Sequence, residues 1–288
     1  MDVLMGLLAA LLWGGTDFLV GLNARAVGVK RAVYFGQALG FSIMSLLLIA
    51  FPAFILKAMS ASINVWLIGV AAAGLTVSGA LALSKAFALG KASIVAPVVT
   101  SYGVVTTLLS WAAGEQIGLL QLLCIALCVV GVILSSIHGD SKIPHATQTS
   151  SSVAYALLAA LFYGTSFWLQ GQFVLPVLGP VTMLWLAYLI GLIVLLAIVL
   201  RIKDGLKMPP LKNCMTLTGA SLMNLGGFSS FAWGAVAGSV SVVTVISTLS
   251  GGIAAILGYV FFKERLGKIQ VLGVILVLLG AFVLHLKT

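Results

Sequence analysis

The sequence predicts an all-α integral membrane protein of ten transmembrane helices, arranged as two inverted five-helix repeats around a central cavity. The composition is the first reason: of 288 residues, 61% are hydrophobic and 7% are charged, against roughly 45–50% and about 25% in soluble domains. Apolar runs of about 20 residues, the length that crosses a bilayer, are the second. The third is a weak similarity between the two halves of the chain.

Ten apolar runs follow one another, with little sequence left for an extramembrane domain. They are continuous rather than alternating in polarity, which favours helices over a barrel, because a helix satisfies its own backbone groups in lipid. A polar segment, residues 138–152, separates five runs from five. The first five runs lie near 3–22, 33–56, 64–84, 93–113 and 118–137, and the others near 153–173, 180–200, 214–236, 240–262 and 267–286.

The polar linker divides the chain into a first repeat, 1–137, and a second, 153–288. The pentapeptide Leu-Leu-Ala-Ala-Leu that begins at Leu7 recurs at Leu157, and the segment that begins at Glu115 resembles the one at Glu264. Because each repeat holds an odd number of spans, the second must enter the membrane from the opposite side. Inverted repeats of this kind are typical of alternating-access transporters.

Several other classes of protein find no support. The first run has no basic segment before it and no small-residue cleavage site, so we expect it to stay as a span rather than act as a signal peptide. Cys124, Cys128 and Cys214 form no CxxC pair, and no histidine cluster occurs, so no metal or cofactor is expected. Motifs for nucleotide binding, metalloproteases and serine hydrolases are missing, so neither ATP-driven pumping nor an enzyme is predicted.

The net charge of +9 is not arranged to bind nucleic acid, since no basic face or aromatic-basic module carries it. Basic residues gather instead in the loops after the odd-numbered runs, which predicts a multi-pass protein of the plasma or inner membrane with both termini on the non-cytoplasmic side. Lys57 and Lys287 lie on the opposite side. The odd-loop residues are Arg25, Lys30, Arg31, Lys85, Lys91, Lys142, Arg201, Lys203, Lys207, Lys212, Lys263, Arg265 and Lys268.

Short motifs in both halves resemble the EamA family of the drug/metabolite transporter superfamily. They are Ala10-Leu-Leu-Trp-Gly14, the turn Ala88–Ser93 leading to Ala96-Pro97, a Gly-Glu pair before the fifth run, and Lys263-Glu-Arg-Leu266 before the tenth. The resemblance covers essentially the whole chain. It implies a basket of ten helices, with a cavity formed by the first four helices of each half and with the fifth and tenth as supports. It also implies ATP-independent transport of amino acids, related metabolites or drugs.

Asp17 is the foremost candidate for function, because a carboxylate within a span costs roughly 2.5–3.5 kcal/mol to insert and by default marks a pathway, a proton relay or an ion pair. Trp13 lies on the same helical face, one turn earlier. A structural hydrogen bond to a neighbouring helix, or a hydrated position near the interface, are the alternative readings. The repeat-related position holds Phe167, so the two halves are expected to differ at this point.

Aromatic rings beside amides or hydroxyls form stripes on other runs and suit a small zwitterionic or aromatic ligand, because rings exclude water while polar tips fix orientation. Helix packing is the alternative for each member. The further substrate-binding candidates are Tyr34, Gln37, Ser101, Tyr163, Ser166, Gln170, Trp185, Tyr188, Asn224 and Ser247.

The sequence as a whole predicts a secondary transporter, a permease or exporter, that moves a small metabolite such as an amino acid by alternating access. Coupling to protons and exchange against a second solute both remain open, so the expected partners are a small molecule, the lipid bilayer and protons. The alternative is a channel or a non-transporting membrane scaffold. A channel would show charged or carbonyl-rich filter segments, and none is visible.

Overall fold

The computed structural model describes residues 2–114, 118–119, 123, 126–127, 130–131, 133–134, 149–203, 205–237, 243, 246–262 and 267–283, and all regular structure within them is helical. The expected span at 118–137 falls largely outside the described residues. So do most of the linker and the start of the run at 240–262. The ten-helix count therefore stays a prediction.

The first repeat begins with α1 and α2, which are separated by a single residue, Gly28. Two expected spans are interrupted. The run predicted at 33–56 breaks at Phe51 and Pro52, and the run at 93–113 breaks at Thr100 and Ser101, whose hydroxyls donate to Pro97 O and Val98 O over 2.6 and 2.8 Å. The helices are α1 (Asp2–Val27), α2 (Val29–Ala50), α3 (Ala53–Met59), α4 (Ile63–Leu89), α5 (Ala92–Val99) and α6 (Tyr102–Ala112).

The second repeat starts at Thr149, four residues before its expected start at 153. A π-helical turn follows its first helix, and the next helix is kinked at Gly179, whose φ of 75° is open to glycine but rare for other residues. Pro180 follows the kink. The elements are α8 (Thr149–Leu169), the π turn η1 (Gln170–Val174), α9 (Leu175–Val199), α10 (Leu211–Ala237), α12 (Leu249–Phe262) and α13 (Lys268–Val283).

Five helical stretches of the described chain are long and apolar enough to cross a membrane: Leu4–Val27, Val29–Ala50, Ile63–Leu89, Ala92–Ala112 and Ser150–Val199. The last runs through α8, η1 and α9, and its 50 residues have the length of two crossings, about 75 Å at 1.5 Å per residue. Helix α10 is long enough but too polar to be among them, since it carries several Ser, Thr and Asn residues. Shorter apolar helices occur at Leu249–Phe261 and Val271–Gly280.

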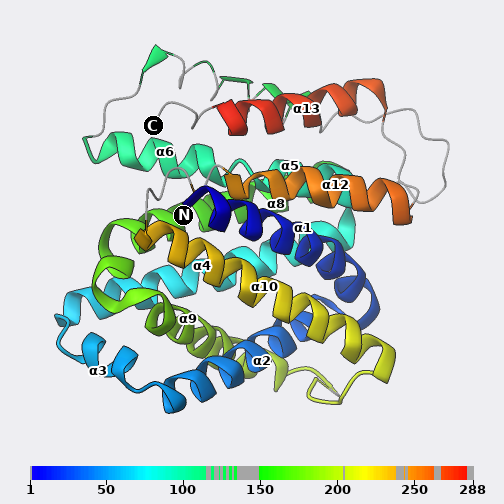
Figure 1. The fold of residues 1–288 in the computed structure, drawn as a ribbon. Coiled ribbons are helices and arrows are strands. Elements are labelled where there is room, and N and C mark those ends of the chain that lie inside the picture. The colour runs from blue at the N-terminus through cyan, green and yellow to red at the C-terminus, as the bar shows by residue number, and fades with distance from the viewer. Residues whose placement is uncertain are drawn as a thin grey trace.

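Close packing joins the two repeats. Helix α1 lies along α10 and α12, α4 along α8 and α9, and α2 along α9, as Figure 1 shows. Glycine permits the closest approaches: a Cβ on Gly14 would lie 2.6 Å from Ile253 Cγ2, and one on Gly6 would lie 2.8 Å from Ile246 Cβ. These two glycines therefore fit α1 against the last part of the second repeat, as small residues do between membrane helices.

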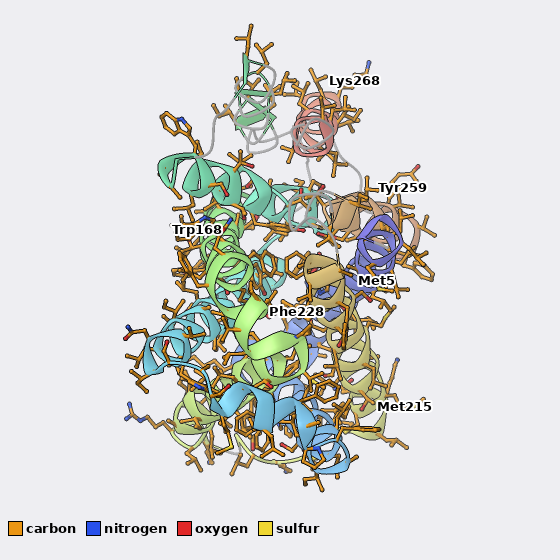
Figure 2. All side chains as sticks on the ribbon, turned by 60° about the vertical axis from the view of Figure 1, so that its left-hand side comes forward. Met5, Trp168, Met215, Phe228, Tyr259 and Lys268 are labelled. Atoms are coloured by element: carbon orange, nitrogen blue, oxygen red, sulfur yellow. The ribbon has the colours of Figure 1, made fainter. Side chains whose placement is uncertain are left out.

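Large apolar side chains cover the outside of the molecule. Met215 is 69% exposed and Tyr259 is 66% exposed, and Figure 2 shows both on the periphery while Phe228 lies inside. Such a surface would be a liability in water, but it is the surface that hydrocarbon requires. The exposed apolar residues therefore agree with helices embedded in lipid.

Arginines hold several helix ends together at one end of the molecule. Arg25, near the end of α1, donates to Phe87 O over 3.2 Å and to Gly90 O over 2.6 Å. These carbonyls close α4, where a cation is favoured by the helix dipole. Arg31, near the start of α2, donates to Gly205 O over 3.2 Å in the loop between α9 and α10. Basic residues from odd-numbered loops of both repeats thus gather at this end.

Candidate functional site

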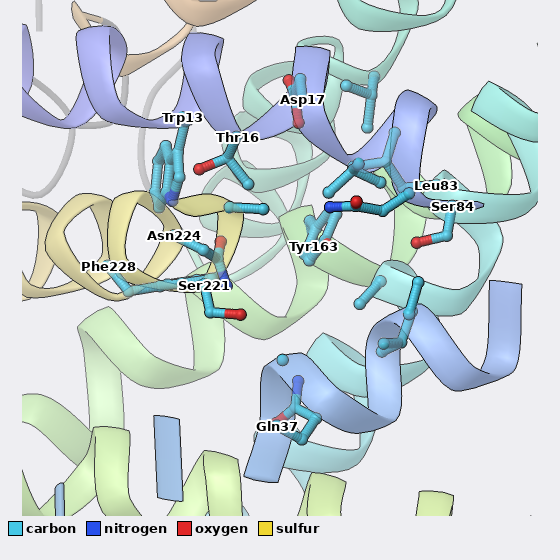
Figure 3. A pocket seen from close by; sticks show the side chains of 18 of the residues that line it. Trp13, Thr16, Asp17, Gln37, Leu83, Ser84, Tyr163, Ser221, Asn224 and Phe228 are labelled. Atoms are coloured by element: carbon cyan, nitrogen blue, oxygen red, sulfur yellow. The ribbon is translucent and has the colours of Figure 1, made fainter. Parts of the chain in front are cut away.

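A cavity lies between the two repeats, with α1 on one side and α2 opposite, as Figure 3 shows. Its volume is about 120 Å³. One water needs a cavity of at least about 10–15 Å³, so the space holds several waters. The cavity is therefore large enough for a small organic molecule.

Helix α1 brings Trp13, Thr16 and Asp17 to the cavity. The Thr16 hydroxyl donates to Leu12 O of its own helix over 2.8 Å. Asp17 is only 8% exposed. Within the described ranges no hydrogen bond or ion pair reaches its carboxylate, and the other residues that line the cavity there are uncharged. A buried carboxylate without a protein partner is costly, and such groups gather at functional sites.

An aromatic cluster forms another wall, with Phe167 of α8 at its centre. Its ring stacks on Trp13 and Tyr163 with centroids 5.8 and 6.0 Å apart. The Tyr102 ring meets it edge-on at 5.2 Å, and the Phe228 ring lies 6.1 Å away. These separations are in the range of favourable aromatic pairs. The cluster gives the cavity one apolar, preorganised wall beside the carboxylate.

Polar but uncharged side chains complete the lining. Gln37 of α2 faces the cavity from the side opposite Asp17, and Ser221 and Asn224 project from α10 (Figure 3). Asn23 lines one end, where its amide donates to Thr216 O over 3.2 Å and accepts from the Thr216 hydroxyl over 2.7 Å. This pair joins α1 to α10 at the end of the molecule where Arg25 and Arg31 lie.

Five of the predicted substrate-binding residues come together in the cavity: Trp13, Asp17, Gln37, Tyr163 and Asn224. The other seven lie outside its lining, and their assignment to substrate stays a prediction.

Ser166 and Gln170 hold α8 against α4 rather than facing the cavity. The Ser166 hydroxyl lies 2.8 Å from Thr76 Oγ1 and also donates to Ala72 O over 2.8 Å. The Gln170 amide donates to Ser166 Oγ over 2.9 Å. Ser166 is fully buried, so this network satisfies polar groups between two helices.

Three other candidates have contacts outside the cavity. Trp185 donates from its indole nitrogen to Ser45 Oγ over 3.1 Å, and the Tyr34 ring lies 5.3 Å from that of Phe35. Ser101 bonds to its own helix end, as described above.

Two of the candidates lie close to residues of the cavity lining. Ser247 lies 2.9 Å, oxygen to oxygen, from Tyr102 Oη, and Tyr102 itself lines the cavity. The Tyr188 hydroxyl is buried without a hydrogen-bond partner in the described part of the chain, although Asn224 lies beside it. Ser247 and Tyr188 therefore lie next to the lining residues Tyr102 and Asn224 and do not line the cavity themselves.

Sequence reasoning missed several lining residues. On α10, Leu217, Ser221, Asn224 and Phe228 all line the cavity, and their spacing of four, three and four is the period of one helical face. Extending the stripe from Asn224 would have found them. Thr16 and Ser84 gave no such signal, because lone hydroxyls in apolar helices commonly bond to their own backbone. No group of three or more His, Cys, Asp or Glu that could hold a metal occurs among the described residues.

Comparison with known proteins agrees with this architecture. The profile of the EamA-like transporter family matches residues 1–137 and 150–286, one copy in each half. A solved structure described as "Crystal structure of protein" superposes with a TM-score of 0.68 over 98% of this chain and 95% of its own, at 16% sequence identity. At this identity the likeness shows the fold alone. No curated protein matches the chain significantly.

Proposed function

The chain belongs to the EamA-like transporter family and is thus a membrane protein of the drug/metabolite transporter type, and from this we propose that it moves a small organic solute by alternating access. The observation that carries the proposal is the cavity enclosed between the two repeats. Its lining comes from α1, α2, α4, α5 and α6 of the first half and from α8, α10 and α12 of the second. A solute bound there is held by both halves, so a movement of one half against the other can change the side from which it is reached.

We infer which end would open from the polar contacts between the repeats. Asn23 bonds to Thr216, and Arg31 bonds to Gly205, and each pair joins one repeat to the other. Each such bond contributes on the order of 1–3 kcal/mol, which is small enough to be broken when one repeat moves against the other. Opening at this end therefore requires release of the Asn23 and Arg31 contacts while the opposite end closes.

The basic loops support an orientation. Arg25, Arg31 and the loop after α9 gather at one end, and an excess of basic residues favours the cytoplasmic side. We propose that this end faces the cytoplasm of a plasma or inner membrane, with the N-terminus outside. Cysteines placed in the two end regions and labelled from one side of intact cells test this directly.

Asp17 supplies the group that couples transport. Its carboxylate is charged or protonated according to what else occupies the cavity, so it can carry a proton in one direction or pair with a positively charged solute. The test is uptake into proteoliposomes of amino acids, sugars and cationic organic solutes, with and without an imposed pH gradient. Movement of no solute under any gradient would refute transport, and unchanged gradient dependence in Asp17→Asn would remove the coupling role.

A further inference from the structure

The Asp17 carboxylate faces the cavity without a positive partner. Among the described residues that line the space, Asp17 has the one carboxyl group, and none of the others is basic. The basic residues nearest in sequence on α1 and α4 are turned elsewhere: Arg25 bonds to the end of α4, and Lys85 is exposed. A charge removed from water without compensation is strongly unfavourable. A positively charged occupant would supply the missing partner.

The wall next to the carboxylate suits the body of such an occupant. Phe167, the repeat counterpart of Asp17, is the centre of the aromatic cluster with Trp13, Tyr102, Tyr163 and Phe228. Aromatic rings pack favourably against an aromatic body, and such pairs contribute about 0.5–1.5 kcal/mol beyond the area they bury. The two repeat-related positions thus provide different halves of one site, a charge from α1 and an apolar surface from α8.

A zwitterion or an anion fits this lining poorly. A ligand carboxylate would enter a space whose described lining offers no basic side chain and would be repelled by Asp17. The donors that remain are neutral amides and hydroxyls, among them Gln37, Asn224 and Ser221. Interactions between charges are strong where water is scarce, so this repulsion is not screened as it would be in bulk solution.

Resting on the proposed transport function, we propose that the solute is an organic monocation with an aromatic or alicyclic body. Its cationic head lies at Asp17 and its body against the Phe167 ring. Amino acids, one of the solute classes that the resemblance implies, are then disfavoured by their carboxylate.

The test is calorimetric binding to the purified full chain in detergent, with four ligands that differ in charge and body: phenyltrimethylammonium, tetramethylammonium, phenylalanine and 3-phenylpropionate. Phenyltrimethylammonium has about ten non-hydrogen atoms and a permanent charge, so no proton equilibrium of the ligand enters. We expect it to bind at least about tenfold more tightly than phenylalanine or 3-phenylpropionate. Equal or tighter binding of phenylalanine would overturn the proposal.

Variants assign the two parts of the site. We expect Asp17→Asn to weaken phenyltrimethylammonium by about tenfold or more, whereas the control Asp204→Asn, which removes the same charge between α9 and α10, leaves it unchanged. Phe167→Leu should weaken phenyltrimethylammonium but not tetramethylammonium, which lacks the ring. Unchanged binding in a folded Asp17→Asn would also overturn the proposal.

Two further measurements keep the outcomes separate. Should Asp17→Asn fail to elute as a single species, Asp17→Glu, which keeps the charge, is expected to retain the cation preference, and its loss of that preference would count against the proposal. Transport is scored separately in proteoliposomes. Uptake of a zwitterion with no binding of cations refutes the monocation while the transport function stands. Asp17-dependent binding of cations without movement of any solute refutes the transport function, while the monocation site stands.

Discussion

Gly227 allows Trp13 to reach the cavity, and its replacement by alanine tests how tightly that wall is built. A Cβ at this position would lie 2.5 Å from Trp13 Cδ1 and 2.6 Å from Nε1. Ordinary carbon contacts are about 3.5–4.0 Å, so the indole or α10 must shift by about 1 Å. Overpacking of this kind costs about 1–3 kcal/mol, and the better helix propensity of alanine returns less than about 1 kcal/mol.

We therefore expect Gly227→Ala to lower the thermal unfolding midpoint in detergent and to weaken binding of any ligand that contacts Trp13. Gly74→Ala is the matched control, because it also lies within a helix and a Cβ there meets nothing within 4 Å. That variant should be as stable as the original or slightly more so. Trp13→Leu removes the clashing ring, so its destabilisation should be smaller in the Gly227→Ala background. Equal midpoints for the two glycine variants, with additive effects of Trp13→Leu, would refute the reasoning.

Three other substitutions have distinct expected results. Arg25→Gln should destabilise the protein by about 1–2 kcal/mol because two carbonyls at the end of α4 lose a charged donor, read as a lower unfolding midpoint. Ser166→Ala should cost about 0.5–2 kcal/mol by breaking its bond to Thr76 between two membrane helices, with ligand affinity unchanged; a loss of affinity at unchanged stability would instead return Ser166 to the binding site. Asn23→Ala, which loses the bonds to Thr216, should make a cysteine at position 221 react faster with an impermeant maleimide added at the Arg25 end. An unchanged labelling rate would show that Asn23 does not hold this end closed.

The sequence was most informative where polarity conflicted with its surroundings. Asp17 stood out because a carboxylate is costly in an apolar run, and the repeat alignment pointed to Phe167 as its counterpart; both line the cavity. Periodicity was less informative about which face of a buried helix meets a ligand. Tyr163 faces the cavity, while Ser166 and Gln170 bond toward α4 and each other, yet all three share a stripe in sequence.

The pattern of apolar residues also did not predict the breaks in the helices. Hydropathy remains high through Pro52 and through Thr100 and Ser101, so the runs at 33–56 and 93–113 read as continuous. The interruptions follow from local hydrogen bonding and from the imino group of proline, which an average over 20 residues does not register. The starts of α1 and α4 were predicted to within one residue, but both helices continue five residues past their expected ends, through Arg25 and Lys85. A long basic side chain can extend from a helix end toward water, so a charge did not mark where either helix stops.

The polarity of α10 has a consequence for how the protein is made. A helix of 27 residues that is not apolar enough to be counted among the membrane-crossing stretches has little tendency to leave the insertion machinery for lipid by itself. It packs along α1, which is synthesised about two hundred residues earlier. We expect α10 to enter the bilayer only against an N-terminal half that is already integrated, so biogenesis has an obligatory order, and the polar side chains Ser221 and Asn224, which line the cavity, add to the cost of its insertion.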